Sequence, residues 1–506
     1  MAGVVMELVD HLSTGFGVAL TPANLGFALI GALVGTLIGV LPGIGPIATI
    51  AMLLPLTFRL EPVSGLIMLA GIFYGAQYGG STTAILVNLP GETSSVVTCI
   101  DGHQMARQGK AGSALAIAAL GSFFAGTIST FIIAMFAPPL AQVGQSFGAP
   151  EYFALMVLGL IAAVVLAHGS VLKAIAMIIL GLLFGLVGTD GQTASQRFTF
   201  DITALADGID FAVLAIGLFG VGEVITNLTR GSEDRSIMSA PIKRLWPSRE
   251  DFRLAWPAVL RGTGLGSILG VLPGGGATLS SFAAYVLEKK VARDPTRFGR
   301  GAVEGVAGPE SANNAGAQTS FIPMLTLGIP GNAVMALMIG AMTIHGIQPG
   351  PQIMTERPNL FWGMVASMWI GNLMLLVINL PLIGIWVQLL KVPYRFLYLS
   401  ILLFCAIGVY TIGNSPFSVL VAAFFGVLGY VFVRLDCEPA PMILGFVLGP
   451  LMEDNLRRAM RISGGDPMIF VNRPISLGLL IAAAVLLLMV ALPAIRRKRE
   501  EAFQES

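Results

Sequence analysis

Two stretches of the sequence carry hydroxyl and amide side chains next to Pro-Gly pairs, within segments that are otherwise apolar. They run from Gly71 to Ser95 and from Gly308 to Asn332. Breaks at such pairs leave backbone groups free on half-helix ends, where carbonyl groups suit Na⁺ and positive N-termini suit carboxylates. Because buried hydroxyls and amides are costly unless they pair or bind something, the two stretches predict a binding site for an ion or an anionic solute.

The candidate ligands combine these polar side chains with the residues of the Pro-Gly breaks. Neither stretch contains Lys or Arg, so helix dipoles and amides would have to hold an anion. An alternative for some hydroxyls is that they cap the broken backbone. The substrate- or ion-binding candidates are Pro42, Gly43, Gly45, Ser81, Thr82, Thr83, Asn88, Pro90, Gly91, Pro273, Gly274, Gly276, Ser311, Asn313, Asn314, Thr319, Ser320, Pro330 and Gly331.

Two acidic residues stand in the same stretches. Glu92 directly follows Pro90-Gly91, and Glu310 lies near the start of the second stretch. Each is a candidate for a proton or cation site, and a role in helix caps and polar pairs explains them equally well. The pattern suggests Na⁺ at the Pro-Gly breaks as a coupling ion, without identifying its ligands, and it suggests no other cofactor.

The composition indicates which kind of chain must position these residues. Of the 506 residues, 55% are hydrophobic and 11% are charged, and the mean hydropathy is +0.82. Soluble chains carry about 25% charged residues, so we expect an all-α polytopic membrane protein in the lipid bilayer. The net charge of +1 excludes nucleic-acid binding by a broad basic surface. The sequence contains no HExxH, GxSxG or Cys/His metal motif and no ATP site, which predicts that the protein is not an enzyme.

Apolar segments follow one another along the chain and predict its helices. A full membrane span needs about 20 residues, and the segments beside the breaks at 42–46 and 273–276 are shorter. We therefore expect re-entrant hairpins or broken helices there. The predicted segments are 24–41, 46–58, 63–80, 81–100, 112–137, 151–168, 171–188, 209–228, 257–272, 276–288, 311–328, 332–345, 359–389, 396–413, 415–434, 438–452 and 474–495.

The two halves of the chain repeat one another. A long period of this kind indicates a duplicated half-transporter. Glycines at every fourth position occur in both copies, and they predict close helix packing more than binding. The glycines are Gly31, Gly35, Gly39, Gly262, Gly266 and Gly270, and the matching segments are 31–45 with 262–276, 75–77 with 316–318, and 89–91 with 329–331.

The basic residues predict how the two halves are oriented, because Lys and Arg mark the cytoplasmic side. They gather in 229–256 and 289–300, whereas the first hairpin opens onto Arg59 alone. This difference predicts two inverted-topology repeats. Arg457 and the two arginines that follow it, at 458 and 461, do not fit, since they would lie outside.

These features divide the chain into five parts. They are an N-terminal interfacial segment (1–23), a first repeat with scaffold helices (24–228), a cytoplasmic basic loop (229–256), a second repeat with scaffold helices (257–495) and a cytoplasmic C-terminal tail (496–506).

The repeated blocks resemble the large membrane subunit of the tripartite tricarboxylate transporters, the TctA type. The resemblance covers nearly the whole chain. It rests on GVLPGIGP (39–46), GIFYGAQYGGSTTAILVNLPGE (71–92), DGHQMARQGKAG (101–112), GVLPGGGATLSSF (270–282), GPESANNAGAQTSFIPMLTLGIPGNAVMALM (308–338), HGIQPGP (345–351) and CEPAPMILGFVLGPLMEDNLRRA (437–459).

This resemblance implies a permease subunit in the bacterial inner membrane that imports tricarboxylates or related carboxylates such as citrate. It implies a small integral-membrane subunit and a periplasmic solute-binding protein as partners, and uptake coupled to a cation, with Na⁺ expected. The alternative function is an ion or solute channel, which saturable and gradient-dependent uptake would exclude. The paired re-entrant hairpins favour a sliding, elevator-like motion over a rocking motion, by analogy with transporters that contain such hairpins.

Overall fold

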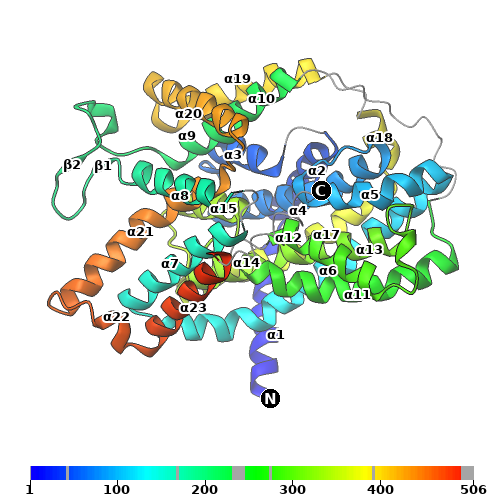
Figure 1. Cartoon of the computed structure of the whole chain (residues 1–506), viewed down its shortest axis with the longest axis horizontal. Helices are drawn as coiled ribbons and strands as arrows, with labels where there is room; N and C mark the ends of the chain where they lie inside the picture. Colours follow the sequence, from blue (N-terminus) through cyan, green and yellow to red (C-terminus); the bar gives the residue numbers. More distant parts are fainter. Residues whose placement is uncertain are drawn as a thin grey trace.

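The computed structural model describes residues 2–41, 45–166, 170–230, 245–272, 276–389 and 394–491. Almost all of them lie in helices (Figure 1). In these ranges, six helical stretches are long and apolar enough to cross a membrane, and several shorter apolar helices accompany them. The expected all-α polytopic fold is confirmed, whereas the inverted relation of the two halves and their re-entrant hairpins stay predictions.

The first half of the chain ends before the basic segment around residue 240. A 3₁₀ turn (Thr93–Ser95) precedes α5, and π-helical turns join α5 to α6 (Ala106–Lys110) and α9 to α10 (Ile216–Val221). The strands β1 (Gly188–Thr189) and β2 (Gln196–Arg197) form a small antiparallel hairpin. The helices are α1 (Ala2–Ala19), α2 (Pro22–Val40), α3 (Pro46–Thr57), α4 (Pro62–Val87), α5 (Val96–Met105), α6 (Ala111–Gln145), α7 (Ala149–Leu166), α8 (Val171–Gly185), α9 (Phe211–Ala215) and α10 (Gly222–Arg230).

The second half is helical as far as it is described. A 3₁₀ turn (Pro295–Arg297) lies between α12 and α13. The helices are α11 (Arg249–Val271), α12 (Gly276–Val291), α13 (Glu304–Thr319), α14 (Phe321–Leu327), α15 (Ala333–Ile344), α16 (Ile353–Glu356), α17 (Pro358–Asn379), α18 (Ile383–Leu389), α19 (Tyr394–Gly413), α20 (Pro416–Arg434), α21 (Ala440–Ile462), α22 (Ile469–Asn472) and α23 (Pro474–Ala491).

Several helix boundaries differ from those expected from the sequence, and two of them have a clear physical reason. The segments 63–80 and 81–100 were expected as separate helices, but α4 continues through Gly79-Gly80-Ser81 to Val87. Gly79 packs against α2 and Gly80 against Glu92 and Ser95, so the helix has no reason to break before Asn88, which adopts the left-handed conformation with φ 58°. Helix α11 begins at Arg249 rather than at 257, because Ser248 and Asp251 form a capping box. Residues 249–256 of the expected basic loop therefore belong to α11.

Glycine ladders bring two pairs of helices into close contact, as their spacing predicted. Helix α2 packs on α4, and α11 packs on α13. A methyl group placed on Gly35 would lie 2.4 Å from the carbonyl oxygen of Ile72, and one placed on Gly266 would lie 2.3 Å from that of Ala312. The other ladder glycines meet the partner backbone in the same way. The two copies of the repeat therefore use the same helix-packing device.

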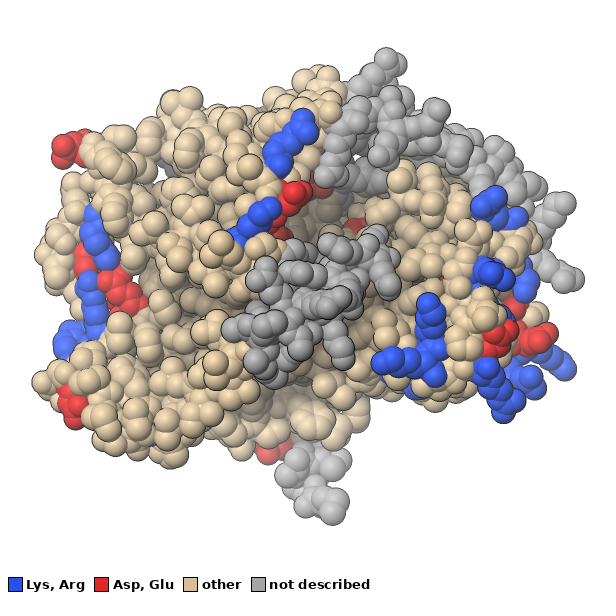
Figure 2. Space-filling model, in the orientation of Figure 1, with Lys and Arg blue, Asp and Glu red and all other residues tan. Residues whose placement is uncertain are grey.

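The helices form two hydrophobic clusters. The larger contains residues of α2, α4, α6, α13 and α17, and the smaller is built mainly from α7, α8 and α21. The scaffold helices expected in the first repeat are divided between the two clusters: α6 belongs to the larger cluster and packs against α13, whereas α7 and α8 belong to the smaller one. Figure 2 shows a surface that is largely free of charge, with groups of charged side chains toward the two ends of the long axis. Such a distribution fits a protein surrounded by lipid.

Candidate functional site

The broken stretches of the two halves have the same local geometry. Helix α4 ends at Asn88, and α14 ends at Gly328, whose φ is 74°. Glu92 and Asn332 then occupy the N-cap positions of the next helical turns, and Asn332 accepts a hydrogen bond of 3.0 Å from the N–H of Met335. Thus Pro90-Gly91 and Pro330-Gly331 each join a helix C-terminus to a helix N-terminus.

Glu310 on α13 lies where the two halves of the chain meet. Its carboxylate is fully buried and accepts hydrogen bonds from two first-half residues. The Ser81 hydroxyl on α4 donates across 2.5 Å, and the Thr98 hydroxyl on α5 donates to the other carboxylate oxygen. The predicted cation candidate is thus placed against α4, whose Ser81 was also a predicted ligand.

Glu92 is held by a second group of first-half side chains. The Gln77 amide donates to its carboxylate across 2.9 Å, and the Ser94 hydroxyl lies within hydrogen-bond distance of both Glu92 and the Gln77 amide oxygen. Glu92 also interacts electrostatically with Glu310. We call Gln77, Ser81, Glu92, Ser94, Thr98, Glu310 and Asn313 the carboxylate cluster.

Asn313 differs from the other members of the cluster, because it lacks a hydrogen bond. Its side chain is fully buried, and neither its amide nitrogen nor its amide oxygen has a partner of normal geometry. Its amide nitrogen approaches the Glu92 carboxyl group as a donor without reaching the geometry of an ordinary hydrogen bond. A buried amide without partners costs free energy unless something binds to it. Asn313 is therefore the predicted residue that best fits a ligand role.

Other predicted hydroxyls satisfy the protein backbone. Thr83 donates 2.7 Å to the carbonyl oxygen of Val40, at the C-terminal end of α2 where carbonyls lack helical partners. Ser311, Thr319 and Ser320 donate to carbonyl groups of their own helix. These side chains therefore bond to the backbone, and Thr83 serves the capping role that was the alternative to binding.

The remaining candidates fall into three groups. Asn314 donates to the Ser122 hydroxyl across 2.7 Å, whereas Thr82 lines a small cavity described below. A methyl group on Gly91 would lie 2.0 Å from the carbonyl oxygen of Gly39, so Gly91 serves close packing. The residues Pro42, Gly43, Pro273 and Gly274 lie outside the described part of the chain, as does the C-terminal tail 496–506.

The N-terminus of α3 is already occupied by a carboxylate of the chain itself. The N–H of Gly45, the N-cap residue, donates to Glu223 of α10 across 3.2 Å. In the second hairpin, Gly276 has a φ of 50° and lies beside Asn332. The N-terminal end of α3 therefore contacts a carboxylate of the chain itself, and whether it also binds a substrate stays a prediction.

Comparison with known proteins places the chain in a family. Residues 25–444 match the family model described as the tripartite tricarboxylate transporter TctA family. The chain belongs to the TctA family. Like other TctA proteins it is a multi-pass membrane subunit of a tripartite transporter.

Relatives of this TctA protein occur in Agrobacterium vitis. One is an uncharacterized 52.8 kDa protein in the TAR-I ttuC' 3'region, 59% identical over 99% of this chain and 100% of its own length. Another is an uncharacterized protein in the TAR-II ttuC' 3'region, 58% identical over 47% of this chain and 99% of its own length. No solved structure matches the chain.

The structure of the TctA protein also shows site residues that the sequence analysis did not single out. Gln77 and Thr98 bind the two carboxylates, and Tyr78 donates 2.7 Å to Asn372 of α17. A cavity of about 10 Å³ lies beside Ser81 and Thr82, large enough for about one water molecule. Gln77 recurs as Gln318 in the second copy of the repeat, and this recurrence could have marked it as a site residue. Nothing in the sequence marks Thr98.

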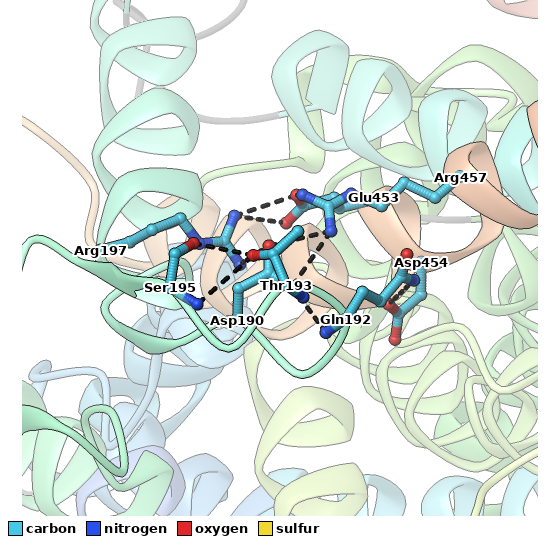
Figure 3. Close-up of polar contacts among 8 residues, drawn as sticks. All are labelled: Asp190, Gln192, Thr193, Ser195, Arg197, Glu453, Asp454 and Arg457. Carbon is cyan, nitrogen blue, oxygen red and sulfur yellow. Dashed lines mark hydrogen bonds and ion pairs between the residues drawn. The ribbon is translucent and has the colours of Figure 1, made fainter.

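A second polar region of the TctA protein lies at its edge, where the β1–β2 hairpin meets α21 (Figure 3). Asp190 pairs with Arg457 across 2.9 Å, and Arg197 pairs with Glu453 across 3.0 Å. The N–H of Gln192, together with Arg457, lowers the pKa of the Asp190 carboxyl from its ordinary 3.8 to about 2. Asp190 is therefore ionised at neutral pH, and this network fastens the hairpin to α21.

Proposed function

We propose that this TctA protein is the permease subunit that imports tricarboxylates or related carboxylates across a bacterial inner membrane. A periplasmic solute-binding protein would deliver the substrate, a small integral-membrane subunit would complete the system, and a Na⁺ gradient would drive uptake. Family membership supports this proposal, and one structural observation carries it. Buried carboxylates and an unpaired amide gather where the two halves of the chain meet.

The chemistry of these residues agrees with an anionic substrate that travels with a cation. Within the described ranges, no Lys, Arg or His hydrogen-bonds to the carboxylate cluster, so a bound anion has no positive side chain there. Helix N-termini at the Pro-Gly breaks, such as that of α15 after Asn332, supply about half a positive charge each. A co-bound Na⁺ would supply the rest of the compensation and tie uptake to the ion gradient.

An uptake assay with the complete system tests this proposal. Cells that lack their own carboxylate carriers would express this chain with its small subunit and binding protein, and uptake of radiolabelled di- and tricarboxylates would be measured. We expect saturable uptake that is lost when Na⁺ is replaced or when the binding protein is omitted. Uptake that rises linearly with concentration would indicate a channel, and no uptake of any carboxylate would contradict the proposal.

A matched pair of asparagine variants links the assay to the site. Asn313→Ala removes the unpaired buried amide, whereas Asn455→Ala removes one that donates only to Leu451 of its own helix α21. Loss of a buried ligand costs about 1–3 kcal/mol, so Asn313→Ala should weaken the apparent affinity about ten- to hundredfold. Asn455→Ala should transport like the unchanged protein. Equal transport by both variants would exclude Asn313 from the site.

A further inference from the structure

The carboxylate cluster contains residues of both halves of the chain, and its two acidic residues carry charges of the same sign when ionised. Glu310 comes from the second half, and both hydroxyls that bind it come from the first. Glu92 comes from the first half, and the amide that faces it, Asn313, comes from the second. Asn313 follows Glu310 by three positions on α13, so the two side chains lie on the same face of that helix.

The partners of the two carboxylates do not neutralise them. Ser81, Thr98, Ser94 and Gln77 contribute hydroxyl and amide dipoles, and none carries a charge. An ionised carboxylate away from water is costly without a counter-charge, and two that interact with each other are costlier. The charge of the cluster must therefore be balanced by a bound cation or by a proton.

Several charged or polar groups on the neighbouring helices have partners of their own outside the cluster, and Lys289 and Lys290 at the end of α12 are exposed. Cys99 on α5 and Tyr78 on α4 also interact with Glu310, but neither can bring a positive charge. The pairs are Arg261 on α11 with Glu288 on α12, Arg297 with Glu304 of α13, Lys110 beside α6 with Asp251 of α11, and Tyr285 of α12 with Asp101 of α5.

Two adjacent asparagines show which amide is left for a ligand. Asn314 donates to Ser122 and to the carbonyl oxygen of Glu310, so α6 and its own helix use its side chain. Asn313 is equally buried, yet both its amide atoms lack a hydrogen bond of normal geometry. The amide oxygen of Asn313 is unpaired, and it is a suitable ligand for a hard cation, since such cations prefer oxygen.

We propose that Glu92 and Glu310 together bind one monovalent cation between the two halves of the chain, with the amide oxygen of Asn313 as a further ligand. The proposal deepens the proposed function, since it rests on a transport role and names the residues that hold the coupling ion. Binding of the cation draws α4 and the Thr93–Ser95 turn toward α13. The cation therefore stabilises the contact between the halves whether or not a carboxylate is present.

Thermal unfolding of the purified full-length chain in detergent, without substrate, tests this site. The midpoint would be measured in NaCl, KCl and N-methylglucamine chloride at equal ionic strength, and again across a pH series. A specific cation at a hundred times its dissociation constant should raise the midpoint by about 3–5 °C. The variants are Glu92→Gln, Glu310→Gln and Asn313→Ala, and the control is Glu304→Gln, which removes a carboxylate of α13 that pairs with Arg297.

We expect Na⁺ to stabilise the unchanged protein and the Glu304→Gln variant, and the stabilisation to be lost in the three cluster variants. If Na⁺ has no effect but acid stabilises the protein and Glu310→Gln removes that effect, the bound cation is a proton. Stabilisation by Na⁺ that survives in both Glu→Gln variants overturns the proposal, as does a protein indifferent to both ions. If Glu310→Gln does not fold, Asn313→Ala decides the question. If the cation stabilises the protein but no carboxylate is taken up, the proposed function is rejected and the proposed cation site is retained.

Discussion

Neighbouring polar residues of this chain have different roles, although their side chains are chemically alike. Ser81 donates to Glu310, whereas Thr83, two positions later on the same helix, donates to the backbone of α2. The difference arises because residues two positions apart on a helix point in different directions, here toward α13 and toward α2. A polar side chain in a membrane helix is thus explained only by the group that it faces.

Thr83→Val should destabilise the protein although it keeps the shape of the side chain. The Val40 carbonyl at the end of α2 would lose a buried partner, at a cost of about 1–3 kcal/mol. Thr326→Val is the matched control, since Thr326 is as buried and donates only to Ile322 of its own helix. Chemical unfolding in mixed micelles would compare the two variants. A Thr83→Val protein as stable as the Thr326→Val protein would show that the cap contributes little.

At the scale of helices, the two copies of the repeat share their glycine ladders and differ in an ion pair. Both use glycine ladders to bring a long helix against the backbone of its partner. In the described ranges, α11 and α12 add a partly buried ion pair, in which Arg261 donates to Glu288 across 2.8 and 2.6 Å. The matching positions of the first hairpin hold Ile30 and Thr57, which cannot form such a pair. The contact between α11 and α12 is therefore the more strongly fastened of the two.

Substitution by alanine should have opposite effects at two glycines of α11. Gly266→Ala would push a methyl group to 2.3 Å from the Ala312 carbonyl oxygen, whereas Gly264 has nothing within 4 Å. Overpacking costs about 1–3 kcal/mol, while alanine in place of an unpacked helical glycine gains up to about 1 kcal/mol. Gly266→Ala should lower the thermal midpoint, and Gly264→Ala should keep or raise it. Equal midpoints would mean that the helices separate at little cost.

At the scale of the whole molecule, the ion-pair network explains an exception to the charge pattern. Arg457 lies on the side that the basic residues predict to be outside, where an arginine is unexpected. It pairs with Asp190 and Glu453, so its charge is matched locally by acidic groups. The β1–β2 hairpin and the C-terminal part of α21 therefore lie on one side, which Figure 2 shows at the opposite end of the long axis from the charges near α11 and α13.

Single cysteines at two exposed threonines would test the orientation of the whole chain. In a background without the native cysteines, Thr193→Cys in the β1–β2 hairpin and Thr296→Cys after α12 would be treated with a membrane-impermeant maleimide. We expect Thr193→Cys to react in intact spheroplasts and Thr296→Cys to react only after permeabilisation, because the predicted topology puts them on opposite sides. Labelling of both from one side would rule out the inverted arrangement.

Much of the architecture was predictable because it depends on local sequence. The apolar segments, the glycine ladders and the breaks after Val87 and Leu327 follow from residue type and spacing, since helix propensity and close approach are local properties. One exception was local in origin, and the other arose from packing between helices. The capping box at Ser248 lengthened α11, and the glycines before Ser81 did not end α4, because packing against α2 and against Glu92 and Ser95 outweighs their low helix propensity.

What the sequence determined by itself was therefore a duplicated, all-helical membrane protein of the TctA type, with Glu92 and Glu310 among its candidate site residues. Only the tertiary structure decided which candidates face one another. Ser81 meets Glu310 across 229 positions of the chain, and Arg457 meets Asp190 across 267. Asn313 is left unpaired while Asn314 is not, because different helices cover the two sides of α13. Such pairings depend on how whole helices pack, which residue type and spacing along one segment do not encode.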